Sequence, residues 1–192
     1  EVFTLLTLAA AARQDAGRMP GEQHLKAIKS VAPVLRALRH ADGALARFHG
    51  GGRGLEGRLD RALASSGVKP VSSTALTMGF ARLSHGRTSV IVDAAQPPSG
   101  LASANAHAST LSFELTSGRR PVIVNCGSGA TFGKSWRRAG RATPSHSTLG
   151  IDGLSSARVA PVGRNGTGAE VLTEAPRDVR FERADADGSS WL

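Results

Sequence analysis

The 192-residue sequence has no tyrosine and only one cysteine, Cys126. Without Tyr, no phenol of this chain can act as a general acid or base. A single Cys excludes an internal disulfide framework, and neither a CxxC pair nor the Cys/His spacing of a zinc finger occurs. Aromatic residues make up 4% of the chain and are not interleaved with basic ones. Base stacking is therefore poorly provided for, and no nucleic acid partner is expected.

Long apolar runs are also absent. No stretch approaches the roughly 20 apolar residues that span a bilayer, so we expect no membrane span. Residues 2–12 are apolar, but they are too few for a span, and no basic segment precedes them as in a signal peptide. Because the chain begins at Glu1 rather than Met, we interpret it as a fragment whose true N-terminus is missing.

Positive charge is abundant: the formal net charge is +9. One interpretation is a polyanionic partner. The other is a GC-rich genome whose codons favour Arg over Lys, because the arginines are spread along the chain and do not form one cluster. The densest basic segment holds Lys134, Arg137, Arg138 and Arg141 around Trp136. These side chains are either a solvated loop or a binding surface, in which guanidinium forks bind carboxylate or sulfate and the indole stacks on a sugar.

Three helical segments are expected in the first third of the chain. Residues 1–16 are rich in Ala and Leu and predict a buried helix. Apolar residues at three- and four-residue spacing predict an amphipathic helix over residues 22–39, in which Pro33 predicts a kink or a break. A further apolar stripe covers residues 55–63. Between them we expect a turn at 41–43 and a short strand at 44–48.

After Val68 the apolar pattern changes to alternation. Turns are expected at residues 85–87 and 117–119, and residues 127–141 read as a basic, glycine-rich excursion. Helices followed by strands predict an α+β multidomain arrangement, divided between Gly67 and Thr74 into residues 1–68 and 69–192. The expected strands are residues 76–83, 89–93, 109–116, 121–125, 147–151, 169–172 and 179–183.

Two histidines stand beside expected strand starts. His107 and His146, with Asn125 at the end of a strand between them, could supply two imidazoles and an oxygen to a divalent metal, most naturally zinc. The alternative is that each His is a structural residue. Cys126 is adjacent to Asn125, but successive residues of a strand point to opposite faces, so its thiol should face away. The glycines at 50–52 and 127–133 match neither a P-loop nor a dinucleotide fingerprint.

The stretch from Ser89 to Gly153 resembles the heparinase II/III-like family of polysaccharide lyases. Within it, residues 141–149 are similar to the family's R-x-T-x-x-H-[NS]-T segment. Residues 36–48 also resemble the family's hinge between a helical toroid and a sheet domain. The segments concerned are residues 90–93, 107–114, 122–127 and 141–149.

The resemblance implies an incomplete (α/α) toroid followed by an antiparallel β-sandwich. This chain would hold the end of the toroid and hinge at residues 1–68 and the first part of the sandwich at 69–192, truncated at both ends. The parent protein would be a lyase that cleaves a uronic-acid-containing acidic polysaccharide by β-elimination. The family also implies a structural zinc ion, held by two His and a carboxylate, and a place in the periplasm or cell envelope.

Site residues follow from the resemblance position by position. His107 and His146 match the family's zinc-ligand histidines, and Asn125 stands where the carboxylate ligand would be. Asn105 occupies the position of the family's catalytic His, and an amide cannot act as a general base. We therefore expect the fragment to be inactive alone. Two alternatives remain: a non-catalytic relative that binds acidic glycans, and a basic nucleic-acid-binding module.

Overall fold

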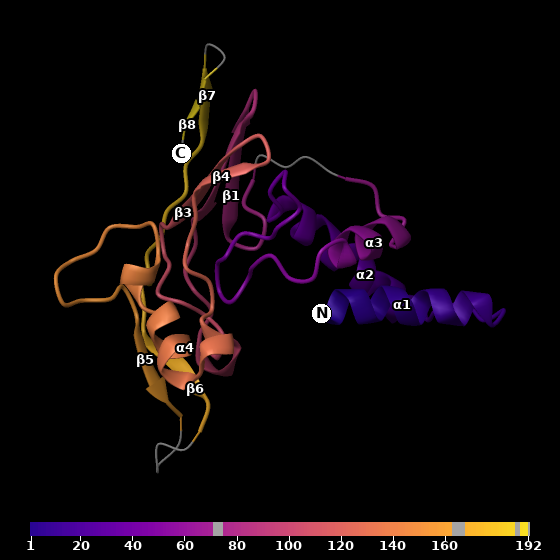
Figure 1. Ribbon diagram of the computed structural model, residues 1–192, viewed down its shortest axis with the longest axis horizontal. Coiled ribbons are helices and arrows are strands. Elements are labelled where there is room, and N and C mark those ends of the chain that lie inside the picture. Colours follow the sequence, from indigo (N-terminus) through magenta and orange to yellow (C-terminus); the bar gives the residue numbers. More distant parts are fainter. Residues whose placement is uncertain (71–74, 163–167, 187–188, 192) are drawn as a thin grey trace.

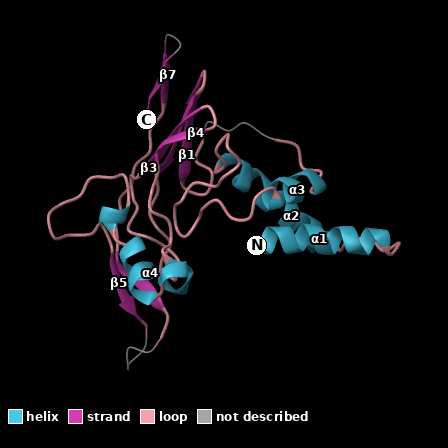
Figure 2. Cartoon of the chain, in the orientation of Figure 1, coloured by secondary structure: helices cyan, strands magenta, loops and turns pink. Residues whose placement is uncertain are grey.

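The structure is a computed structural model that describes residues 1–70, 75–162, 168–186 and 189–191. Three helices gather at the N-terminal end of the chain, and antiparallel strands follow them (Figures 1 and 2). This order confirms the α+β class. The toroid, the truncation at both ends and the division into 1–68 and 69–192 stay predictions. Residues 71–74, where part of the expected boundary falls, lie outside the described residues.

The three N-terminal helices are α1 (Val2–Asp15), α2 (Glu22–Ala37) and α3 (Arg58–Ser65). The apolar stripe of α2 packs against both neighbours, which is why this amphipathic pattern forms a helix. Pro33 does not break α2, since the helix continues to Ala37. The shared core consists of Phe3, Ala10, Ile28, Ala32, Ala62 and Leu63.

Helix α1 is not the fully buried helix that its composition predicts. Phe3 and Ala10 lie in the core, but Val2, Leu5 and Leu8 are exposed. A composition of Ala and Leu all round the helix cannot tell which face is covered, so this expectation was wrong for half of the helix surface.

Strands β1 (Phe80–His85), β2 (Thr88–Asp93), β3 (Phe113–Ser117) and β4 (Arg120–Ile123) form one antiparallel sheet in chain order. The two hairpin turns lie where the sequence predicts them. Strands β5 (Arg158–Pro161) and β6 (Glu170–Glu174) form a second antiparallel pair, and β7 (Ala184–Ala186) and β8 (Ser189–Trp191) form a third. The expected strand at 169–172 is therefore confirmed, within β6.

Other expected strands were wrong. Residues 44–48 contribute only an isolated bridge between Arg39 and Leu45, and residues 147–151 only a bridge from Ile151 to Leu154. Residues 109–112 do not extend β3, because Leu111 takes a positive φ of 64° that ends the extended run. Residues 179–183 precede β7 and are not in a strand. The glycine-rich segment 127–141 contains a helix that the sequence did not predict, α4 (Lys134–Gly140).

The segment between α2 and α3 docks the helices onto the sheet. Phe48 stacks on Phe80 of β1 with ring centroids 5.3 Å apart, and both pack around Ile91 of β2. Arg82 of β1 donates hydrogen bonds to the carbonyls of Ala37 and Arg39 at the end of α2. These contacts bring residues 40–50 against the end of the sheet where β2 stops. None of the described helices is long and apolar enough to cross a bilayer.

Candidate functional site

His107 and His146 lie side by side in the interior. Both are buried, and their ring centroids are 5.2 Å apart. Burial, and next the neighbouring His146, lower the pKa of His107 to about 3. Burial, and next the nearby His49, lower the pKa of His146 to about 4. Both imidazoles are therefore neutral at pH 7, which is the form that binds a metal ion.

Three ring nitrogens of this pair have no hydrogen-bond partner among the described residues. They are Nδ1 of His107 and both Nδ1 and Nε2 of His146. Buried polar atoms without a partner are costly, so such a cluster marks a place where an ion or water belongs. With Zn–N bonds of about 2.0 Å, two imidazoles at a tetrahedral angle have centroids roughly 5 Å apart, which the pair matches. The two histidines fit zinc.

Asn125 is buried beside the pair, and hydrogen bonds fix its amide. Its Oδ1 accepts from the Ser147 backbone N–H at 2.8 Å, and its Nδ2 donates to Glu114 Oε1 at 3.4 Å. The amide oxygen keeps a second lone pair, so it could act as a neutral third donor. No group of three His, Cys, Asp or Glu suited to a metal occurs in the described part of the chain. Cys126 is exposed while Asn125 is buried, although β4 ends at Ile123 and the two residues lie beyond it.

Glu114 of β3 is a buried carboxylate that holds neighbouring segments of the site together through hydrogen bonds. Its Oε1 accepts from the backbone N–H groups of Asn125 at 3.0 Å and Arg47 at 3.1 Å, and its Oε2 lies 2.8 Å from His40 Nε2. Burial alone would raise the pKa of Glu114, but these hydrogen bonds, led by that of His40, hold it below the usual value. Glu114 thus ties residues 40–47 to the strand end that carries Asn125.

His49 is a site residue that the sequence did not reveal. Its Nδ1 accepts from the backbone N–H of His107 at 3.0 Å, and its Nε2 lies 3.3 Å from Asp93 Oδ2. Asp93, at the end of β2, also accepts from Ser109 Oγ at 2.7 Å. His49 has a positive φ of 47° beside a glycine-rich turn. A carboxylate directly after a Val/Ile strand was the available signal for Asp93; for His49 there was none, because its contacts are distant in sequence.

Asn105 lies at the surface next to the buried histidine pair. Its Oδ1 accepts from Arg137 Nη2 at 3.3 Å, and the same nitrogen donates to the Ala104 carbonyl at 2.8 Å. Arg137 also lies 3.5 Å from a carboxylate oxygen of Glu170. The position expected for a general base is therefore held by an amide that an arginine engages.

Arg141 is 1% exposed and differs from the other arginines of its segment. It donates hydrogen bonds to the carbonyls of Ala106, Ser103 and Glu170. Burial, and next the nearby Arg137, lower the pKa of this guanidinium. All of these partners lie in the protein, so Arg141 supports the loop that carries His107 and presents no free fork to a ligand.

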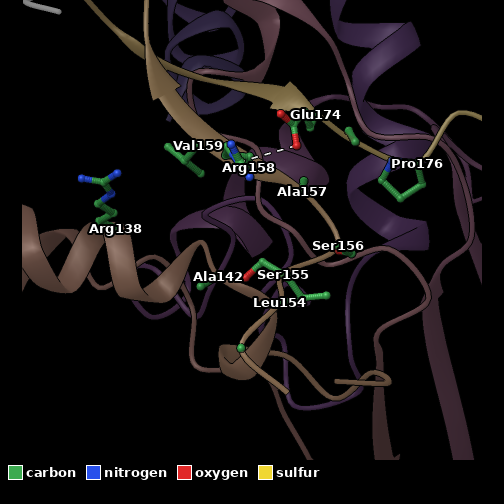
Figure 3. Close-up of a pocket in the computed structure, with 12 residues that line it drawn as sticks. Arg138, Ala142, Leu154, Ser155, Ser156, Ala157, Arg158, Val159, Glu174 and Pro176 are labelled. Atoms are coloured by element: carbon green, nitrogen blue, oxygen red, sulfur yellow. Dashed lines mark ion pairs between the residues drawn. The ribbon is translucent and has the colours of Figure 1, made fainter. Parts of the chain in front are cut away.

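Helix α4 presents the remaining residues of the predicted binding surface. Trp136 is 63% exposed and Phe132 is 74% exposed, and the two rings meet edge to face with centroids 6.2 Å apart. Arg138 has no ion pair among the described residues and lines a cavity of about 640 Å³ between α4 and the β5–β6 hairpin. On the hairpin side of this cavity, Arg158 of β5 pairs with Glu174 of β6 at 3.6 Å (Figure 3).

Comparisons with known proteins identify the family of the chain. The profile of the family described as Heparinase II/III-like, C-terminal, matches residues 68–192. A curated relative, the FtsZ-localized protein C of Caulobacter vibrioides (strain NA1000 / CB15N), is 31% identical over 192 residues; these make up 100% of this chain and 33% of the relative. The chain thus spans about a third of that relative's length. No solved structure matches the chain significantly. From the profile match, the chain belongs to the Heparinase II/III-like C-terminal family.

Proposed function

We propose that this chain is part of a protein that acts on an acidic, uronate-containing polysaccharide, and that its own residues bind the glycan rather than supply the base. One observation carries the proposal: next to the buried histidine pair, α4 exposes Trp136, in contact with Phe132, and places Arg138, which has no ion-pair partner among the described residues, at a cavity. Exposed aromatic rings in mutual contact are surface that a sugar face can cover, and a free guanidinium fork matches a carboxylate.

The residues of the chain divide this work. Trp136 and Arg138 are two positions apart on a short helix and so lie on different faces, one for stacking and one directed to the cavity. Arg137 holds Asn105 and the backbone beside it, and Arg141 holds the loop that carries His107. Neither arginine is free to bind substrate, so recognition of the uronate falls to Arg138.

Zinc would be held by His107 and His146, with Asn125 as a neutral oxygen donor. Bound there, the ion would link the loops that carry the two histidines and satisfy their unpartnered nitrogens. The neutral imidazoles fit this structural role, and Asn125 should make the ion weaker-held than a carboxylate would.

β-Elimination by the complete protein is the second candidate. The histidine pair of the family is retained in a form able to bind metal, which favours an intact lyase architecture. Elimination requires a base to remove the proton beside the carboxylate and an acid to protonate the leaving oxygen. Asn105 cannot provide the base, so another residue would have to supply it.

The test is calorimetric titration of the chain with polygalacturonate oligosaccharides, beside Trp136→Ala and Arg138→Gln. We expect saturable binding that each substitution weakens, with Arg18→Gln, which removes an exposed charge from the helical part, as the control. Equal affinities in all four proteins would contradict the proposal. Ultraviolet absorbance from unsaturated uronates, measured with the chain and with a longer version, separates binding from cleavage. Binding to duplex DNA but not to any glycan would favour the nucleic-acid alternative.

The name of the relative refers to localisation with FtsZ, so a scaffolding role is an alternative function for this chain. Co-sedimentation with FtsZ polymers, in the absence of any glycan binding, would favour that alternative over the proposal.

A further inference from the structure

The two hairpin turns of the four-stranded sheet lie together at the end of the sheet away from the histidine pair. Thr88, which starts β2, pairs with Ser117, which ends β3, so the β1–β2 and β3–β4 turns are neighbours. The backbone N–H of Gly118 donates to the Arg87 carbonyl at 2.6 Å, which joins one turn to the other. This contact gathers Arg87, Arg119 and Arg120, the arginine cluster, from two separate turns.

The arginine cluster carries positive charge that the described residues do not compensate. Its three exposed arginines, with Ser117 and Pro121, line a cavity of about 730 Å³, and none of the described side chains that line it is a carboxylate. No arginine of the cluster makes an ion pair within the described ranges. Three like charges held together repel one another, so the cluster gains stability when an anion enters.

We propose that the arginine cluster is a second acidic-glycan subsite, which binds sulfate esters of the chain whose uronate lies at α4. The inference rests on the proposed function in taking the ligand to be a glycan. One guanidinium fork satisfies the two oxygens of one carboxylate, whereas three forks around one cavity match a sulfate ester, which offers three terminal oxygens as acceptors. Single-stranded nucleic acid would need aromatic rings to stack on, and none of the described residues that line this cavity is aromatic.

The cluster and the histidine pair are far enough apart to be tested independently. β2 runs from Thr88 at the cluster to Asp93 at the site, five residue steps or about 17 Å. A substitution at the turns therefore leaves α4, Asn125 and both histidines untouched.

The experiment compares three proteins: the unsubstituted chain, the triple variant Arg87→Gln, Arg119→Gln and Arg120→Gln, and a control with Arg18→Gln, Arg53→Gln and Arg61→Gln. The control removes the same charge from exposed positions of the helical part. Each is titrated with heparin-derived oligosaccharides, which carry sulfate, with polygalacturonate oligosaccharides, which do not, and with duplex DNA. Circular dichroism establishes that all three are folded.

We expect the cluster variant to bind the sulfated glycan about tenfold more weakly, as three exposed charge contacts would give, while polygalacturonate binding stays unchanged. The control should lose less than twofold. Equal losses in the two variants would overturn the subsite and leave the proposed function standing. A loss only for the cluster variant, with no effect of Trp136→Ala or Arg138→Gln on any glycan, would support the subsite and refute the proposed surface on α4. Loss of DNA binding alone would overturn the assignment to a glycan.

Discussion

Lowering the pH from 7 to 5 should destabilise the fold through His107 and His146. Their pKa values in the folded protein, about 3 and about 4, lie below the ordinary 6.5 that the unfolded chain restores. Below pH 6.5 these two histidines are therefore protonated in the unfolded chain but stay neutral in the folded protein. The stabilising contribution of neutral burial is complete above pH 6.5 and is lost as the pH falls toward 4.

The magnitude follows from the proton linkage. At pH 5 both histidines are still neutral in the folded protein and almost fully protonated in the unfolded chain. Protonation of each histidine in the unfolded chain then lowers the free energy of unfolding by about 2 kcal/mol relative to pH 7, and the pair lowers it by about 4 kcal/mol. This sum depends only on both folded pKa values lying well below 5. It is a large share of the roughly 5–15 kcal/mol that stabilises a domain.

Urea unfolding at pH 7 and pH 5, in a metal chelator, measures the loss directly. His146→Gln should halve the loss to about 2 kcal/mol, because one titrating group is gone. His85→Gln, at the exposed end of β1, is the control and should keep the full loss. Equal unfolding free energies at the two pH values, or an undiminished loss in His146→Gln, would refute the assignment of neutral buried imidazoles.

Three further substitutions test the network around the site. Glu114→Ala should cost about 3 kcal/mol in urea unfolding, because it strands the buried N–H groups of Asn125 and Arg47 and the ring of His40; a cost below 1 kcal/mol would contradict that role. Asn125→Asp should bind zinc roughly tenfold or more tightly in chelator competition, and should destabilise the zinc-free protein because the new carboxylate faces Glu114; unchanged affinity would exclude Asn125 as a ligand. Arg141→Lys should cost about 2 kcal/mol, since an ammonium cannot reach three carbonyls as the planar fork does, and an unaltered unfolding midpoint would count against this support.

Local patterns predicted the elements whose signal lies within the element itself. The period of α2 and the glycine-containing turns of the two hairpins are of this kind, and the structure confirms them. Helix α4 was missed because it is short and lies among glycines. Residues 147–151 look like a strand, but they have no partner strand among the described residues, and Leu149 and Ile151 are exposed. A strand needs a neighbour, and neighbours are a tertiary property.

For the site, the sequence brought out His107, His146 and Asn125; the structure buries all three and places the two imidazoles side by side. The sequence could not show that the Asn125 amide is fixed by a hydrogen bond from Ser147 and another to Glu114. Nor could it separate buried Arg141 from its exposed neighbours, because an arginine with carbonyl partners and a solvated one read alike in sequence.

The measurement that tests the central claim most directly is the fluorescence of Trp136 in a Trp191→Phe protein, where Trp136 is the remaining indole. Titration with polygalacturonate oligosaccharides should change its intensity and shift its emission to shorter wavelength, saturably, because a sugar would cover an indole that is 63% exposed. A neutral polysaccharide should leave the spectrum unchanged. No change with the acidic glycan, or the same change with the neutral one, would contradict acidic-glycan recognition at α4.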